Sequence, residues 1–311
     1  MKYPKHITLC EVGPRDGLQN EKKLLTAAQK AELIDACADA GFPVIEVGSF
    51  VHPKAVPQMA DTDEVFRLIR HKTDTEYRAL VANLKGVERA VACGCQKIKL
   101  NVSASVAHNL ANLNCTPQES VARFQACTDM ARENNVMVSG SISMAFGSPW
   151  DKEIPLDDVR AIVDAYLKVG VEEISLSDAS GMAIPSQIER MGKKLLAEYP
   201  QVKWWIHLHN TRGLAIANML AAMDVGFTRF DTAFAGCGGC PFVPGAAGNV
   251  ASEDVLHMLD EMNIQTGVDL QKAIAVGHHA EKMLEHPSAS FVLKAGTNRE
   301  LIRELPTKQH K

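Results

Sequence analysis

Helix-like and strand-like stretches alternate along this chain, and a glycine marks several of the transitions. A stretch of mixed apolar and polar residues closes on a glycine, and a run rich in β-branched or aromatic residues begins two or three positions later. Glycine commonly ends helices because it adopts the left-handed backbone conformation at little cost. The transition is clearest at Gly41, Gly94, Gly170 and Gly226. The pattern therefore predicts repeated units of strand and helix.

Eight strands are expected once the remaining apolar runs are assigned. Their ranges are 6–12, 43–49, 77–82, 97–102, 136–142, 172–177, 203–209 and 229–235. Eight strands that alternate with helices over about 250 residues predict a (β/α)8 barrel, the TIM barrel, within the α/β class. A doubly wound open sheet is the alternative fold. It usually has fewer strands and a Gly-x-Gly-x-x-Gly turn after the first one, and this chain lacks that turn.

Capping residues and prolines mark where several helices should begin. Thr26 and Thr116 each precede a glutamine or glutamate three positions later, which is the pattern of a capping box. Pro155 and Pro185 are expected to open two further helices, since proline is well tolerated in the first helical turn. These signals separate the expected strands from one another and support the alternating pattern.

The length and composition suit one large domain. The chain has 311 residues, of which 46% are hydrophobic, so it can bury a sizeable core. No segment has the composition of a linker, and we expect one domain over residues 1–311. The barrel is expected at about 5–262 and a C-terminal helical extension at about 263–311, with an additional helix at 269–286.

Charge and cysteine content argue against several kinds of partner. The net charge is −4 with both signs interspersed, which gives no basic surface for nucleic acid or an anionic membrane. We find neither a signal peptide nor a long apolar run that could span a membrane. Eight cysteines spread along the chain fit a reducing compartment. We therefore expect a cytoplasmic protein without nucleic-acid or membrane partners, and a homodimer as the commonest assembly.

Two histidines end the seventh expected strand and suggest a metal site. His207 and His209 are two positions apart, so both side chains point to the same face of the strand. Asp16, which follows the first strand, could supply a carboxylate, although Arg-Asp-Gly alone is more typical of a polar turn. With Asn249, the set offers two imidazoles and two oxygens without a thiolate. That mixture favours Mg²⁺ or Mn²⁺ over a closed zinc site.

A glycine-rich stretch at 236–249 is predicted to be an active-site loop. Its glycines and prolines exclude regular secondary structure, and glycine lets the main chain approach a ligand closely. Cys240 is a candidate nucleophile or acid within it. The spacing of Cys237 and Cys240 also allows a zinc or redox site, but no second cysteine pair with suitable spacing supports that alternative.

Further charged residues are expected at the mouth of the barrel. Glu46 and Asp178 lie in or at the end of apolar strands, where an unpaired carboxylate is costly to bury, so both should have partners such as Arg15 or metal-bound water. Arg212 follows the histidine pair closely. It could bind a substrate carboxylate or be exposed to solvent.

Several long motifs resemble the 3-hydroxy-3-methylglutaryl-CoA lyase family. The similarity runs from the first strand to about residue 285, which is nearly the whole chain, and the opening and loop motifs are long enough to be specific. The motifs lie at residues 11–21 (EVGPRDGLQNE), 56–61 (VPQMAD), 83–86 (NLKG), 236–254 (GCGGCPF…GNVASED) and 265–272 (QTGVDLQK).

The resemblance implies a metal-dependent (β/α)8 barrel related to isopropylmalate and homocitrate synthases, which cleaves hydroxymethylglutaryl-CoA to acetyl-CoA and acetoacetate. It implies four ligands for a divalent cation, Mg²⁺ or Mn²⁺: Asp16, His207, His209 and Asn249. Arg15 would face the developing enolate, Cys240 would be the catalytic thiol of a mobile loop, and His207 could also act as a base. Glu46 and Asp178 match acidic residues that are important in the family.

The resemblance also implies an acyl-CoA substrate, with Gln19, Lys22 and Arg212 as candidate binding residues. The chain departs from the family pattern after the histidine pair, where it has Asn210-Thr-Arg212 instead of Asp-Thr-Tyr, and at residues 177–181. These departures keep two alternatives open. One is a lyase for a related acyl-CoA, such as citramalyl-CoA or a longer-chain homologue, and the other is a condensing acyltransferase.

Overall fold

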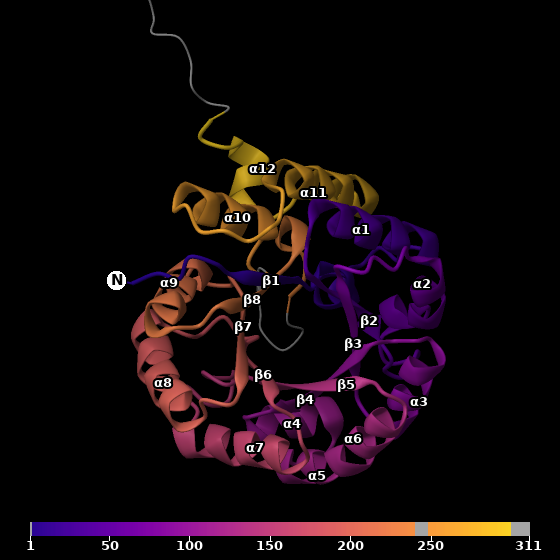
Figure 1. The fold of residues 1–311 in the computed structure, drawn as a ribbon, viewed down its shortest axis with the longest axis vertical. Helices are drawn as coiled ribbons and strands as arrows, with labels where there is room; N and C mark the ends of the chain where they lie inside the picture. Colours follow the sequence, from indigo (N-terminus) through magenta and orange to yellow (C-terminus); the bar gives the residue numbers. More distant parts are fainter. Residues whose placement is uncertain (1, 240–247, 300–311) are drawn as a thin grey trace, which may run out of the picture.

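Eight parallel strands form a closed barrel in the computed structural model, which describes residues 2–239 and 248–299. Each strand pairs with its neighbour in the sequence, and β1 pairs with β8 to close the barrel (Figure 1). The expected (β/α)8 barrel is therefore confirmed. The strands are β1 Thr8–Glu11, β2 Val44–Ser49, β3 Glu76–Val81, β4 Lys97–Ser103, β5 Met137–Ser143, β6 Glu173–Asp178, β7 Lys203–Leu208 and β8 Arg229–Thr232.

The helices surround the barrel, and three of them follow the last strand. The first nine are α1 Ala27–Ala40, α2 Thr62–Leu68, α3 Leu84–Ala92, α4 Val106–Leu113, α5 Pro117–Ala122, α6 Phe124–Glu133, α7 Leu156–Lys168, α8 Pro185–Glu198 and α9 Ala215–Val225. After β8 come α10 Ser252–Glu261, α11 Leu270–Leu284 and α12 Phe291–Ala295. These three lie together outside the barrel, with α11 beside α1 (Figure 1). The additional helix expected near the C-terminus is α11.

Local sequence signals account for many of the element boundaries. Both predicted capping boxes form, and the Thr116 side chain accepts a hydrogen bond from the Glu119 backbone N–H at 3.2 Å. Gly41 and Gly226 end α1 and α9 in the left-handed conformation, with φ of 97° and 113°. Pro185 is the first residue of α8, as expected. Pro155, in contrast, lies immediately before α7 and is not part of it.

The last strand is shorter than expected. β8 was expected to reach residue 235, but it ends at Thr232 and a single 3-10 turn, η4 (Phe234–Gly236), follows. Within this turn Ala235 has a φ of 56°, which is uncommon for a residue with a side chain. Its backbone N–H donates to the Glu253 carboxylate at 2.9 Å, so a buried acid at the start of α10 stabilises the turn.

The two faces of the barrel strands differ in chemistry. Outward-facing residues such as Ile98, Leu100 and Val102 on β4 belong to the main hydrophobic core between barrel and helices. The alternate positions face the interior and carry many polar and charged side chains. Four of them form a cluster at the N-terminal end of the strands, which we call the floor cluster: Glu76, Arg78, Lys97 and Glu173.

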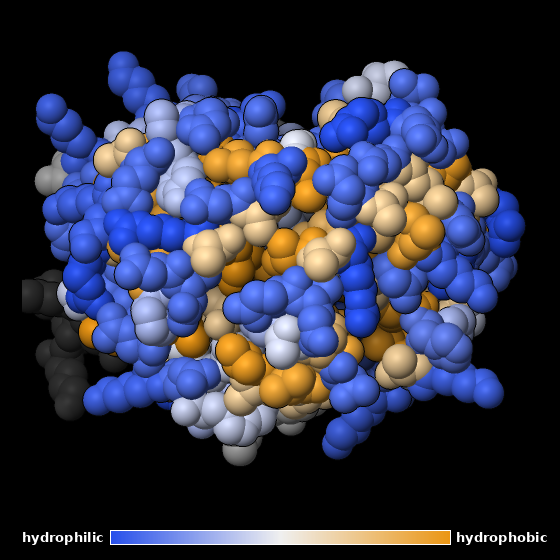
Figure 2. All heavy atoms as spheres, turned by 90° about the horizontal axis from the view of Figure 1, so that it is seen from below, coloured by the Kyte–Doolittle hydropathy of each residue, from blue (hydrophilic) through white to orange (hydrophobic). Residues whose placement is uncertain are grey.

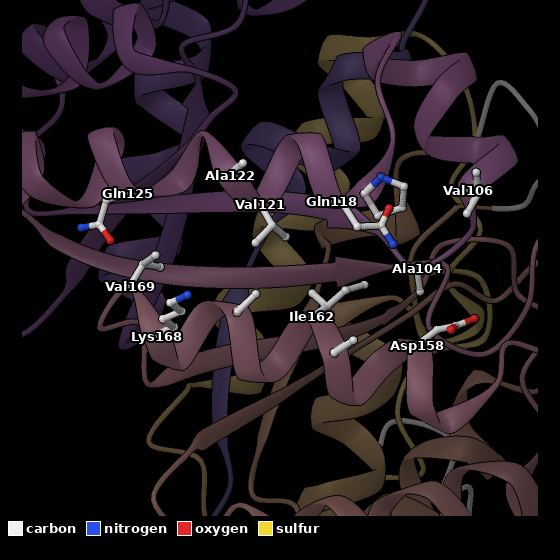
Figure 3. Close-up of a pocket in the computed structure, with 13 residues that line it drawn as sticks. Ala104, Val106, Gln118, Val121, Ala122, Gln125, Asp158, Ile162, Lys168 and Val169 are labelled. Atoms are coloured by element: carbon white, nitrogen blue, oxygen red, sulfur yellow. The ribbon is translucent and has the colours of Figure 1, made fainter.

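A pocket of about 450 Å³ lies outside the barrel, between α5 and α7. From the side of these helices, apolar residues surround a hollow and polar residues surround them in turn (Figure 2). Val121 and Ile162 face each other across the pocket, with Asp158 at one end and Lys168 at the other (Figure 3). None of the described candidate site residues lines it. In the described part of the chain, no helix has the length and apolar character needed to cross a membrane.

Candidate active site

The turn after β1 places Arg15 and Asp16 at the C-terminal end of the barrel. This turn, η1 (Gly13–Gly17), is fixed because the carbonyl oxygen of Val12 accepts hydrogen bonds from the backbone N–H groups of Arg15 at 3.1 Å and Asp16 at 2.7 Å. Gly13 is needed there. A Cβ at this position would lie 2.6 Å from the Phe234 ring and from a Glu11 carboxylate oxygen. The turn and its glycine therefore place the side chains of Arg15 and Asp16 together at this end of the barrel.

Asp16, His207 and His209 form a compact and buried cluster. Their potential ligand atoms all lie within 4.8 Å of one another, as the sequence predicted. An Asp16 carboxylate oxygen is 3.4 Å from Nε2 of His209 and 3.8 Å from Nε2 of His207. The two Nε2 atoms are 3.1 Å apart. Two imidazoles and a carboxylate converging on one point are a suitable set for a divalent cation.

Asn249 joins this cluster from a distant part of the chain. Asn249 pairs with His209 through an isolated antiparallel bridge, which places it beside the residue that follows β7. Its side-chain Nδ2 donates to Asp16 at 2.9 Å and to the carbonyl of Cys237 at 3.0 Å. Its Oδ1 is buried and has no hydrogen-bond partner within the described residues. A buried acceptor in this state costs free energy, and a cation beside Asp16 would satisfy it.

Hydrogen bonding prepares His207 to act as a ligand. Its Nδ1 lies 3.2 Å from Asp231, and because a carboxylate only accepts, Nδ1 must be the donor. This bond leaves a lone pair on Nε2, which faces Asp16 and His209. Burial lowers the pKa of His209 and favours its neutral form, which is the form that binds metals. The residues present therefore fit a divalent metal ion.

Arg15 is held beside the cluster by two carboxylates. It forms ion pairs with Glu46 and Asp16, and both partners are buried. Burial alone would raise the pKa of Asp16, but the Arg15 guanidinium and a hydrogen bond from His209 hold it well below its usual value. Glu46 is thus paired, as the sequence predicted. The site therefore combines a permanent cation with an ionised carboxylate.

Asp178 lies at the end of β6, but its carboxylate is used within a turn. It accepts hydrogen bonds from the backbone N–H of Met182 at 2.9 Å, from that of Ala183 at 3.1 Å and from the Ser180 hydroxyl at 3.1 Å. Burial raises its pKa to about 6. The position is compatible with a role at the barrel mouth, while the contacts show that Asp178 shapes the loop between β6 and α8.

The predicted substrate-binding residues differ in their distance from the cluster. Gln19 belongs to it, because its side-chain Nε2 donates to Asp16 at 3.3 Å. Arg212 is exposed and donates to the carbonyls of Ser180 and Gly181, each at 3.1 Å, so it joins the loops that follow β6 and β7. Lys22 is exposed on the surface. Cys240 lies outside the described residues.

Two charged residues next to the cluster were not identified from the sequence. Lys99 on β4 forms ion pairs with Glu46 and, at 3.5 Å, with Asp231. Asp231 on β8 in turn holds His207. Both lie on strands with apolar residues at neighbouring positions, Ile98 and Leu100 beside Lys99 and Phe230 beside Asp231. The signal that could have revealed them is their alternation with apolar neighbours, which assigns them to the barrel interior.

Two further acids hold the base of the glycine-rich loop. Glu11 accepts hydrogen bonds from the backbone N–H of Gly13 at 2.7 Å and of Phe234 at 2.9 Å. Glu253 binds the backbone of Ala235 and is fully buried. Burial raises the pKa of Glu253 to about 8 and that of Glu11 to about 7. These acids therefore hold the turn at Phe234 and Ala235, which immediately precedes the glycine-rich stretch.

The raised pKa of Glu253 gives a prediction for stability. Its pKa rises from 4.5 to about 8 on folding, so between these pH values the native state binds more protons than the unfolded state. The free energy of unfolding should therefore decrease as pH rises through this window. Replacing Glu253 by glutamine should remove a slope of about 1.4 kcal/mol per pH unit. Urea unfolding at pH 5, 6 and 7 measures it. Parallel pH profiles for the wild type and E253Q would refute the assignment, and the exposed Glu285→Gln variant is the control.

Comparisons with known proteins agree with the fold. The HMGL-like family profile matches residues 6–279. The hydroxymethylglutaryl-CoA lyase of Bacillus subtilis is 38% identical over 93% of this chain and 97% of its own length. An (R)-citramalyl-CoA lyase of Chloroflexus aurantiacus is 40% identical over 93% of this chain and 95% of its own length. A structure of an HMG-CoA lyase from Acinetobacter baumannii with coenzyme A and 3-methylmalate has a TM-score of 0.93 at 39% identity, and the match covers 98% of this chain and 100% of the other.

The match extends well beyond the barrel strands. It includes the turn after β1, the histidine pair on β7 and the segment that carries Asn249, which together form the cluster described above. The chain belongs to the HMGL-like family.

Proposed function

We propose that this protein is a carbon–carbon lyase that cleaves 3-hydroxy-3-methylglutaryl-CoA to acetyl-CoA and acetoacetate. The observation that carries the proposal is the buried cluster of Asp16, His207 and His209 with Arg15 paired to its carboxylate. Relatives that carry the name of this activity are about 40% identical over nearly the whole chain, which supports the same chemistry. Asp16, His207, His209 and Asn249 would hold Mg²⁺ or Mn²⁺.

The reaction requires removal of one proton and stabilisation of one developing charge. The proton leaves the 3-hydroxyl of the substrate, and the bond between C2 and C3 breaks as the C3 ketone forms. A bound divalent metal would act as a Lewis acid that lowers the pKa of that hydroxyl. Asp16 and His207 are the nearby groups that can accept the proton. The electrons of the broken bond pass to the thioester enolate, whose charge Arg15 would stabilise.

The enolate must then gain a proton on carbon to become acetyl-CoA. We assign this step to the thiol of Cys240, which belongs to the glycine-rich stretch. Glu11 and Glu253 hold the backbone just before this stretch, at Phe234 and Ala235, and Asn249 at its other end donates a hydrogen bond to Asp16. Gln19 and Arg212 are proposed to bind the substrate carboxylate, and Lys22 a phosphate of coenzyme A.

Cleavage of citramalyl-CoA is a second candidate activity. A relative with that name is as similar to this chain as the hydroxymethylglutaryl-CoA lyases are. The chain also carries Asn210 and Arg212 shortly after its histidine pair. The Arg212 guanidinium could bind the carboxylate of citramalyl-CoA, which is one carbon closer to the tertiary hydroxyl than that of hydroxymethylglutaryl-CoA. The two substrates share the tertiary hydroxyl and the thioester, so the cluster suits both.

A substrate panel tests the proposal. The purified protein is treated with a chelator and assayed with hydroxymethylglutaryl-, citramalyl- and longer-chain acyl-CoA esters, with and without Mg²⁺ or Mn²⁺. We expect cleavage only with metal and the highest kcat/KM for hydroxymethylglutaryl-CoA. Acetoacetate and pyruvate distinguish the products of the first two substrates. If no ester is cleaved faster with metal than without it, the lyase proposal is wrong.

A further inference from the structure

We propose that Lys99 is a positioning residue that holds, with one ammonium group, the two carboxylates that orient Arg15 and His207. The inference rests on the metal site of the proposed function and adds a residue to it. Among the described residues, the ion-pair partners of Lys99 are Glu46 and Asp231, and neither is one of the proposed metal ligands. Lys99 would act through Glu46 on one side and Asp231 on the other.

The geometry gives Lys99 two arms. On the first, its Nζ pairs with one Glu46 oxygen, while the other Glu46 oxygen accepts from Nε of Arg15. On the second, Nζ lies 3.5 Å from the Asp231 oxygen that also accepts from His207 Nδ1 at 3.2 Å. Thus one cation contacts the carboxylate behind the catalytic arginine and the carboxylate behind a metal ligand.

The contacts of Lys99 with the two carboxylates are buried, so losing them should cost more free energy than losing an ion pair on the surface. The side chains of Lys99, Glu46 and Asp231 are 3%, 0% and 1% exposed. Water therefore cannot screen the repulsion between the two carboxylates if the ammonium is removed. They would separate or take up a proton, and either change releases Arg15 and His207 from their present orientation. Removing one partner of a buried ion pair also leaves an uncompensated charge.

Lys97 provides a matched comparison on the same strand. It lies two residues before Lys99, faces the same interior and is also buried. It pairs with two carboxylates of the floor cluster, Glu76 at 2.7 Å and Glu173 at 2.8 Å. Neither of these contacts Arg15 or His207. Loss of Lys97 therefore reproduces the stability cost of losing a buried lysine without disturbing the ligand cluster.

The test measures metal binding to the full-length protein without substrate. Lys99→Met and Lys97→Met are titrated with Mn²⁺ by calorimetry, and their thermal unfolding is followed in parallel. We expect both variants to lower the Tm. K99M should raise the Kd for Mn²⁺ about 10- to 100-fold, the usual effect of removing a group behind a metal ligand, whereas K97M stays within about twofold of the wild type. Equal effects of the two variants on Kd would overturn the proposal.

A double-mutant cycle adds a readout that a structural role would not give. Asp231→Asn removes the carboxylate through which Lys99 is proposed to reach His207. If Lys99 acts on that arm, the double variant K99M/D231N should weaken Mn²⁺ binding by less than the product of the two single effects. If the fold-change in Kd of the double variant equals the product of the fold-changes of K99M and D231N, the two residues act independently. That result would contradict the proposal that Lys99 reaches His207 through Asp231. If K99M does not fold, the variants Lys99→Arg and D231N still test the proposal. K99R keeps the positive charge and should bind Mn²⁺ within a few-fold of the wild type. D231N lacks the carboxylate behind His207 and should bind Mn²⁺ more weakly than that.

Kinetic assays separate this proposal from the proposed function. In K99M the kcat for hydroxymethylglutaryl-CoA should fall by a larger factor than KM rises. The displaced Arg15 would no longer stabilise the thioester enolate, which forms only during the reaction, whereas the contacts that bind the rest of the substrate would remain. If the wild type cleaves no CoA ester, the proposed function is wrong, and the Mn²⁺ titrations still decide the role of Lys99.

Discussion

Replacing Arg15 by glutamine is expected to lower kcat for thioester cleavage about 100- to 1,000-fold, the range seen when a donor to a developing oxyanion is removed. Binding of the metal ion should not weaken. Arg15 is a cation paired with Asp16, which is a proposed ligand, so it would compete with a bound metal for the same negative charge. Its removal should leave the Kd for Mn²⁺ unchanged or lower it.

The two readouts together identify the role of Arg15. Steady-state kinetics with saturating metal give kcat, and calorimetry gives the Kd for Mn²⁺. Arg70→Gln is the control, because Arg70 also pairs with two carboxylates, Asp35 and Asp39, but on the surface. If R15Q lost metal binding in proportion to activity, Arg15 would be needed to assemble the cluster and not to stabilise the enolate.

Replacing His207 by alanine is expected to abolish metal-dependent cleavage, with a fall in rate of roughly 1,000-fold or more. Lewis-acid stabilisation by a metal is worth several kcal/mol, and each 1.4 kcal/mol is a factor of about ten. The variant removes one of the four proposed ligands and leaves Asp231 without its imidazole partner. The Kd for Mn²⁺ should rise by a similar factor.

Metal titration and activity are measured on the same preparation, with circular dichroism to show that the barrel is intact. His279→Ala is the matched control, since this partly exposed histidine lies far from the cluster on α11 and also has a carboxylate partner, Glu32, at 2.9 Å. A His207→Ala protein that still bound Mn²⁺ with wild-type affinity would exclude His207 from the ligand set.

The sequence predicted those features of the fold that depend on local chemistry. Thr26, Gly41 and Gly226 mark element ends through hydrogen bonds and backbone conformations that involve only neighbouring residues. The spacing of His207 and His209 predicted their common direction, because side chains on a strand alternate. The end of β8 could not be predicted, since the turn at Ala235 is stabilised by Glu253 from a later helix.

The same distinction applies to the site. Glu46 was expected to be paired, but its second partner, Lys99, comes from another strand whose register only the closed barrel defines. The sequence places Asp178 at a strand end, but the direction of its carboxylate depends on the turn whose backbone N–H groups it accepts from. Lys99 and Asp231 contact the site only through other side chains, and the sequence marks them only as charged residues next to apolar ones on a strand.

The way in which the barrel closes has a consequence for folding. Asp16 receives its hydrogen bond from Asn249, which lies 233 residues later, and β1 finds its second neighbour only in β8. A growing chain cannot complete the cluster until nearly all of it has left the ribosome, and contacts at such separation form slowly. A metal that binds the completed cluster stabilises only the closed form. The ion would then connect the turn after β1 with β7 and with the segment after β8, and it would favour the closed barrel over any state in which these parts are separated.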